Sequence, residues 1–272
     1  MTVSDRSISS ELFAAETVPS LRATVRVLLF ILALALLVGA MAYQAPPQGR
    51  VAIGWPGDRL FVGVSPGLGR IPVERGDLFA DELTPDSPTG RSRWTRERAV
   101  IVLPNVGAGS PLQLTLVAQG WPATVGTQPS VMVLIDGAVV GSFVPKPTWE
   151  AYSFAVPGIA HQHGDLTLVL QSSATLFDER DPRPKGVRLA EVRISPAGEA
   201  ALWLPPAWPA VALMGWNALL LALLLRRLRL SQSQVYVITA IGIGAAAIGL
   251  AVARIWMAAI LNVAMVGLLV LL

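Results

Sequence analysis

Two strongly apolar stretches divide this 272-residue chain and leave a polar segment between them. The first covers residues 27–43 (VLLFILALALLVGAMAY), and the second runs from residue 203 to residue 272. Only 14% of all residues are charged, whereas a soluble domain usually has about 25%. Because the deficit is confined to the two apolar stretches, we predict a membrane protein that carries one soluble insert of roughly 150 residues.

Arginines divide the second stretch into three predicted spans. We expect helices at residues 21–43, 203–225, 235–253 and 255–272, a cytoplasmic segment at 1–20, a cytoplasmic loop at 226–234 and an insert at 44–202. A cleaved signal peptide is the alternative for the first helix, but Tyr43-Gln44-Ala45-Pro46 is a poor cleavage site. The last helix ends in an apolar run, so we expect a truncated span or a fragment of a longer multispanning protein.

Positive charge predicts the orientation. Arg22 and Arg26 precede the first span, and Arg226, Arg227 and Arg229 follow the second. Basic residues next to spans stay in the cytoplasm, so we predict a multi-pass protein of the cell membrane with its insert on the extracytoplasmic side. The insert has 14 Lys and Arg against 15 Asp and Glu, which excludes a basic surface for nucleic acid, and the chain has no cysteine for disulfides.

The insert shows eight strand-like segments separated by Gly, Pro and Asp. In one of them, Leu112, Leu114 and Leu116 alternate with polar residues, as in a half-buried antiparallel strand. Asp136-Gly137 predicts a tight hairpin, because this turn requires positive φ. The eight segments are residues 60–64, 99–103, 112–118, 131–135, 139–144, 151–156, 166–171 and 187–194. This spacing predicts an all-β domain, an antiparallel β-sandwich of the jelly-roll kind.

Three segments, residues 131–143, 149–157 and 166–173, resemble galactose-binding-like jelly rolls and carbohydrate-binding modules. There, a strand ending in Asp-Gly precedes a W-x-x-Y-x-F strand and an L-x-L-x-L strand. Residues 181–189 resemble the closing strand of β-domains in bacterial polysaccharide-related proteins, although Lys185 stands where Leu is usual. Such domains also occur as inserts in multispanning envelope proteins similar to GT-C glycosyltransferases. The resemblance implies a sandwich fold and a ligand such as a cell-envelope glycan.

The segment GRSRWTRER, residues 90–98, is the candidate ligand site. Trp94 stands among Arg91, Arg93 and Arg96, and an aromatic face beside guanidinium groups suits a sugar ring or an anionic glycan. The alternative is a structural Trp in a charged strand edge. Trp121, Trp149 and Tyr152 are expected in the core.

Two further clusters could hold a metal ion. Asp178, Glu179 and Asp181 precede the last strand, where jelly-roll modules often bind structural Ca²⁺, although neighbouring arginines could simply neutralise them. His161 and His163 are spaced to share a metal on a strand, but the sequence offers no third ligand, so a solvated loop is favoured. Apart from such Ca²⁺, we expect no cofactor.

The sequence gives little support for an enzyme. No acidic residue follows Glu199, whereas a GT-C type transferase needs a carboxylate at the membrane surface. Arg254 is read as an interfacial turn residue or, alternatively, as a contact for a lipid phosphate. We therefore expect a non-catalytic envelope module that binds glycan or packs on a partner. The alternatives are the N-terminal part of a multispanning glycosyltransferase and an accessory subunit of a larger membrane complex.

Overall fold

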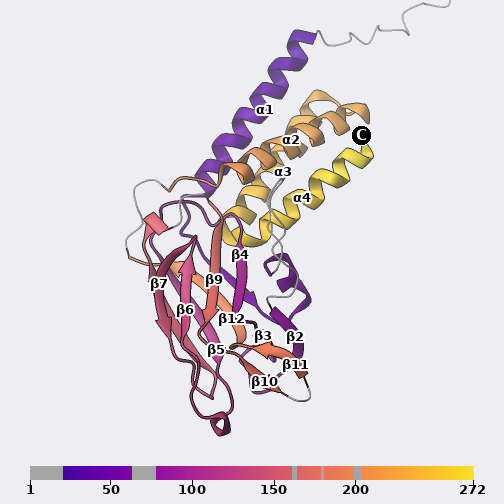
Figure 1. The fold of residues 1–272 in the computed structure, drawn as a ribbon. Helices are drawn as coiled ribbons and strands as arrows, with labels where there is room; N and C mark the ends of the chain where they lie inside the picture. The colour runs from indigo at the N-terminus through magenta and orange to yellow at the C-terminus, as the bar shows by residue number, and fades with distance from the viewer. Residues whose placement is uncertain (1–20, 63–77, 161–163, 179–180, 199–203) are drawn as a thin grey trace, which may run out of the picture.

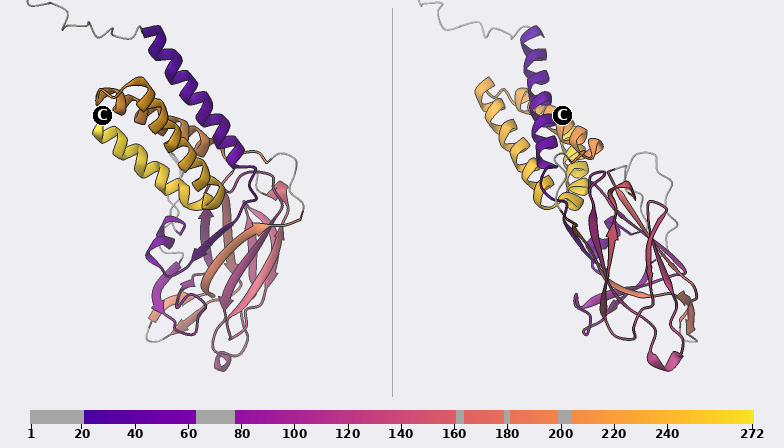
Figure 2. Two further views of the ribbon diagram at one scale, coloured as in Figure 1. Left: turned by 180° about the vertical axis from the view of Figure 1, so that it is seen from behind. Right: turned by 90° about the vertical axis from the view of Figure 1, so that its left-hand side faces the viewer.

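The computed structural model describes residues 21–62, 78–160, 164–178, 181–198 and 204–272. Four of its helices are long and apolar enough to cross a membrane. They are α1 (Leu21–Ala42), α2 (Trp208–Arg227), α3 (Gln232–Val252) and α4 (Arg254–Leu271). All four lie at one end of a β-sandwich, as Figure 1 and the two views of Figure 2 show.

The helix boundaries follow local sequence signals. Pro205 and Pro206 delay the start of α2, which begins at Trp208 with Pro209 in its first turn, a position where proline costs no hydrogen bond. Ser231 caps α3 by accepting a hydrogen bond from the Gln234 amide, and the Gln234 side chain bonds back to the Ser231 amide. This capping box explains why α3 begins earlier than its apolar run.

The β-strands form two main antiparallel sheets. One has the order β2-β3-β12-β5-β8, with β1 also paired to β12, and the other has the order β4-β9-β6-β7. The strands are β1 (Gly49–Ala52), β2 (Leu78–Leu83), β3 (Arg91–Thr95), β4 (Arg98–Leu103), β5 (Leu112–Gln119), β6 (Val131–Ile135), β7 (Ala138–Phe143), β8 (Glu150–Val156), β9 (Leu166–Ser172) and β12 (Arg188–Pro196). A separate hairpin consists of β10 (Leu176–Asp178) and β11 (Asp181–Lys185).

The strand order confirms the predicted jelly roll. The four strands β3-β12-β5-β8 face the four strands β4-β9-β6-β7, and the chain crosses between the two sheets as it does in a double Greek key. Seven of the eight predicted strand segments correspond to β4–β9 and β12. Asp136 and Gly137 have φ values of 48° and 88°, which confirms the hairpin turn between β6 and β7.

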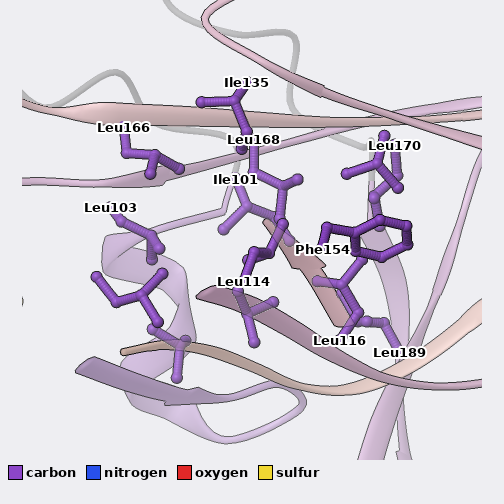
Figure 3. Packing of buried hydrophobic residues seen from close by; sticks show 14 of the residues in the cluster. Ile101, Leu103, Leu114, Leu116, Ile135, Phe154, Leu166, Leu168, Leu170 and Leu189 are labelled. Atoms are coloured by element: carbon purple, nitrogen blue, oxygen red, sulfur yellow. The ribbon is translucent and has the colours of Figure 1, made fainter. Parts of the chain in front are cut away.

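Alternation along the strands builds the core. Leu112, Leu114 and Leu116 of β5 are each 0% exposed, and they meet buried side chains such as Leu168 and Ile101 from the opposite sheet (Figure 3). This period of two explains why these strands were predictable from the sequence.

The strand predicted at residues 60–64 is not found where the chain is described. Pro56–Leu60 form a 3₁₀ turn, because Pro56 takes its first position, and only Val62 makes an isolated bridge to Ile101. Residues 63 and 64 lie outside the described part of the chain. Conversely, β1, β2 and β3 escaped prediction because they are short or charged.

The sandwich and the helices are joined by buried contacts. Gln44 and Leu204, which follow α1 and precede α2, exchange two hydrogen bonds between the Gln44 amide and the Leu204 backbone. Ile255 of α4 is 2% exposed and packs within the sandwich core. A Cβ on Gly49 would lie 2.8 Å from Ile255 Cδ1, so β1 needs glycine to approach the helix this closely.

Arg254 forms the centre of this junction. Its guanidinium donates to the carbonyl oxygens of Ala45 at 2.7 Å, Val106 at 2.9 Å and Leu250 at 3.2 Å. It also lies 4.5 Å from the centre of the Tyr43 ring and is 2% exposed. Arg254 thus lies at the turn between α3 and α4, where a turn residue was predicted, but it is a buried structural cation and not a contact for lipid phosphate.

Candidate functional site at the junction of sandwich and helices

The predicted ligand segment forms strand β3, which separates its side chains onto two faces. Arg91 and Arg93 lie on one face, and Trp94 lies on the other, since neighbouring residues of a strand point in opposite directions. Arg96 follows the strand and is exposed. The arginines of β3 therefore do not surround Trp94.

Trp94 is buried, with 7% of its surface exposed, and packs against Trp121. Arg188 lies 5.0 Å and Lys185 lies 5.9 Å from the centre of its ring. Trp121 donates its indole N–H to the Gly186 carbonyl at 2.6 Å, which fixes this pair beside β12. The partly exposed ring that a stacking platform requires is not observed at Trp94, because the strand directs this ring inward.

An exposed indole lies on the opposite face of β3, at Trp55. This side chain is 48% exposed, and Arg91 lies 5.3 Å from the centre of its ring. The indole N–H donates to the Thr89 carbonyl at 3.1 Å, which fixes the ring plane. Trp55, which the sequence analysis did not single out, thus combines an exposed aromatic face with a nearby guanidinium group.

Trp55 lines a pocket of about 320 Å³ between the sandwich and the start of α4. This volume falls within the usual range for small-ligand sites. Trp256 of α4 forms part of the wall and packs edge-on against Phe61, with ring centres 4.7 Å apart. The remaining lining residues are Arg50, Ala52, Gly57, Asp58 and Thr89.

Asp58 holds the loop that carries Trp55. It is 1% exposed and accepts a hydrogen bond from the Gly54 amide at 2.6 Å. Arg93 pairs with the same carboxylate through two contacts, of 2.8 Å to Oδ2 and 3.0 Å to Oδ1. Such a two-pronged pair is geometrically restrictive, so the pocket is fixed by β3 before any ligand arrives.

A second buried carboxylate, Glu191 on β12, lies beside the pocket. Arg50 and Arg193 both pair with it, at 2.7 Å and 2.6 Å, although more than half of each arginine side chain is exposed. Among the side chains that the structure describes, the pocket and its border thus hold four guanidinium groups, of Arg50, Arg91, Arg93 and Arg193, against the carboxylates of Asp58 and Glu191. This excess of positive charge favours an anionic or strongly polar ligand.

The predicted metal site is only partly described. Asp178 and Asp181 are opposite each other in the β10–β11 hairpin, and Glu179 lies outside the described residues, as do His161 and His163. Within the described ranges, no group of three or more His, Asp or Glu side chains could hold a metal ion. Binding of Ca²⁺ at the hairpin stays a prediction.

Two larger hollows follow the outer face of the β4-β9-β6-β7 sheet. Their volumes are about 450 and 650 Å³, and Gln171 lines both. Most of their described lining residues are of polar types, and none has an aromatic ring on which a sugar could stack. The Trp55 pocket is therefore the better candidate. Sequence reasoning missed Trp55 because the signal there is only a Gly-Trp-Pro-Gly turn.

No protein-family model matches the chain, and no curated protein matches it. Among solved structures, the chain is similar to a family GH115 4-O-methyl-alpha-glucuronidase with specificity for decorated arabinogalactans (11% identity, TM-score 0.34), covering 46% of this chain and 16% of that chain. It is also similar to CBM35 from Paenibacillus barcinonensis (13% identity, TM-score 0.31), and this match covers 45% of this chain and 91% of that chain. A third similar structure is the C-terminal CBM6 of a marine laminarinase from Zobellia galactanivorans (12% identity, TM-score 0.30). The match covers 44% of this chain and 89% of that chain.

Proposed function

We propose that this protein is a membrane-anchored jelly-roll module that binds an acidic glycan in the Trp55 pocket on the extracytoplasmic side. The observation that supports binding most strongly is the half-exposed Trp55 ring. Arg91 lies over this ring, and Arg50 lines the same pocket. An indole face binds the C–H face of a sugar ring, and guanidinium groups bind carboxylates through paired hydrogen bonds.

The helices support the proposed location. The Pro205 carbonyl that precedes α2 accepts a hydrogen bond from the Ala108 amide of the sandwich, so α2 begins at the sandwich. Its last turn carries Arg226 and Arg227, which therefore lie about 30 Å away, one membrane thickness at 1.5 Å per residue. By the positive-inside rule, this basic end stays in the cytoplasm and the sandwich lies outside.

Trp55→Ala is expected to abolish glycan binding while changing the free energy of unfolding by less than about 1 kcal/mol, because a half-exposed ring contributes little to the core. Full-length protein in detergent micelles is applied to an array of neutral and uronic-acid oligosaccharides. Wild-type affinity is expected on the order of millimolar to micromolar, since one stacked ring and one or two charged hydrogen bonds give only a few kcal/mol.

Trp208→Ala is the matched control, because Trp208 is also exposed, at 58%, but lies outside the pocket. Arg50→Gln should weaken binding of acidic oligosaccharides more than binding of neutral ones. Absence of binding by the wild-type protein to every glycan would refute the proposal and favour packing on a partner protein. Equal loss in the Trp208 variant would show that the effect does not arise in the pocket.

A further inference from the structure

The Trp55 pocket adjoins the first turn of α4. Trp256, the third residue of this helix, forms part of the pocket wall. A Cβ added to Gly57 would lie 3.1 Å from the Trp256 ring, and Phe61 contacts the same ring edge-on. The turn Pro56–Leu60, the short indigo coil below α4 in Figure 1, is therefore packed against the start of a helix that is long and apolar enough to cross a membrane.

This contact determines the depth of the pocket. In the proposed orientation, α4 begins at the outer surface of the membrane, where tryptophan side chains are enriched. The headgroup layer outside the hydrocarbon core is about 5–7 Å thick. A pocket that has Trp256 in its wall therefore opens at the level of the headgroups. Sugar rings that are carried by lipids lie at the same level.

The exposed side chains around the Pro56–Leu60 turn support contact with lipid. Trp55, which precedes the turn, and Leu60 are 48% and 46% exposed. Leu60 does not line the pocket, so a bound sugar leaves this side chain uncovered. Arg59 is also exposed. An aromatic ring, an alkyl side chain and a positive charge on one turn are typical of segments that lie at a membrane interface.

The face of α4 that carries Trp256 continues toward the middle of the membrane as an exposed apolar stripe. Val263 and Val270 follow Trp256 by seven and fourteen residues, so at 3.6 residues per turn they lie on nearly the same side of the helix. They are 73% and 80% exposed, and Gly267 between them is exposed as well. An acyl chain along this stripe places its headgroup at Trp256, beside the pocket.

The charge of the pocket selects among lipid headgroups. Arg50 lines the pocket and Arg91 lies over the Trp55 ring, so the site offers guanidinium groups to an anion. A phosphate headgroup satisfies these groups but gives the indole no C–H face on which to stack. A sugar ring that carries a carboxylate satisfies both the guanidinium groups and the indole.

We infer that the ligand of the Trp55 pocket is the headgroup of an acidic glycolipid in the outer leaflet, with an acyl chain along the α4 stripe of Trp256, Val263 and Val270. The inference rests on the proposed function and adds the source of the sugar, which is the surrounding membrane rather than a soluble polysaccharide.

The depth of the pocket is measured without any ligand. Because the chain has no cysteine, the fluorophore NBD is attached at Leu60→Cys. The matched control is Val125→Cys, which is 39% exposed in the turn Ala123–Val125, at the end of the sandwich away from the helices (Figure 1). Phosphatidylcholine that is spin-labelled at its headgroup should quench the fluorophore at residue 60 and not at residue 125. An unquenched fluorophore at residue 60 would place the pocket above the headgroups and overturn the inference.

The ligand experiment compares one acidic sugar in free and lipid-linked form. Full-length protein is placed in phosphatidylcholine nanodiscs, and saturation-transfer difference NMR detects binding of soluble methyl glucuronide. The wild type should give a signal that Trp55→Ala removes, which tests the proposed function. Glucuronosyl dioleoylglycerol in the nanodisc should lower this signal at least about tenfold, because a ligand anchored beside its site has an effective concentration in the millimolar range.

Two control lipids at the same mole fraction keep the test specific. Phosphatidylglycerol has the charge without an acidic sugar, glucosyl dioleoylglycerol has a sugar without the charge, and both should displace methyl glucuronide far less. A wild-type signal that glucuronosyl dioleoylglycerol leaves unchanged would overturn the inference and leave the proposed function standing. Equal displacement by phosphatidylglycerol would also overturn the inference. Absence of any methyl glucuronide signal from the wild type would overturn both.

Discussion

Trp94→Ala is expected to lower the free energy of unfolding by about 3–5 kcal/mol, the usual cost of truncating a buried aromatic side chain. The ring is 7% exposed and packs against Trp121. Its removal leaves a cavity beneath Arg188 and Lys185, which lie over the ring. Urea titration of the full-length protein in micelles, followed by circular dichroism of the sheet, measures the change.

Trp55→Ala is the matched comparison, since the same substitution on the other side of β3 should cost less than about 1 kcal/mol. The two variants therefore separate a structural tryptophan from a binding one. A Trp94 variant as stable as the wild type would show that this ring is not part of the core, and would return it to consideration as a ligand platform.

Arg254→Ala is expected to destabilise the junction between sandwich and helices by about 3–6 kcal/mol. The guanidinium donates two short bonds, to Ala45 at 2.7 Å and Val106 at 2.9 Å, and a bond from a charged group contributes about 1.5–3 kcal/mol. Removing it leaves the buried Val106 carbonyl and the partly buried Ala45 carbonyl without this donor. Arg254→Lys should recover only part of the loss, because one ammonium group cannot reach all of these carbonyls at once.

Heat unfolding of the full-length protein in micelles, with tryptophan fluorescence as the signal, measures this effect. Arg227→Ala is the control, because Arg227 is exposed at the far end of α2, where a substitution should cost less than about 0.5 kcal/mol. If Arg254→Ala and Arg227→Ala unfold at the same temperature, Arg254 does not stabilise the junction. The alternative prediction, that Arg254 contacts a lipid phosphate, would then regain support.

The sequence predicted the fold better than the site. Apolar runs long enough to span a membrane and strands with alternating Leu residues are local signals, so α1–α4 and the strands from β4 to β9 were predictable. The strand β3 was not, because its residues Arg-Ser-Arg-Trp-Thr are mainly polar and its stability depends on pairing with β2 and β12. Pairing between strands so far apart in the chain is determined by the tertiary fold, which no local sequence pattern predicts.

The site depended on that missed strand. The sequence predicted an aromatic ring beside the guanidinium groups of residues 90–98. In the structure, Arg91 lies over the indole of Trp55. Which indole it meets was not predictable, because Trp55 and Arg91 are far apart in sequence, and the β3 pleat directs Trp94 to the opposite face. The contribution of Trp256 to the same pocket depends on the packing of α4 against the sandwich.

The orientation of the sandwich is tested most directly by impermeant labelling of single cysteines, because the chain has none of its own. Ser142→Cys lies on the exposed surface of the sandwich, and Ser233→Cys lies exposed at the start of α3, beside the Arg226–Arg229 cluster. In intact spheroplasts, a membrane-impermeant maleimide should label Ser142→Cys and spare Ser233→Cys until the membrane is permeabilised. Labelling of Ser233→Cys with protection of Ser142→Cys would contradict the orientation, and with it the proposal that the Trp55 pocket meets glycans outside the cell.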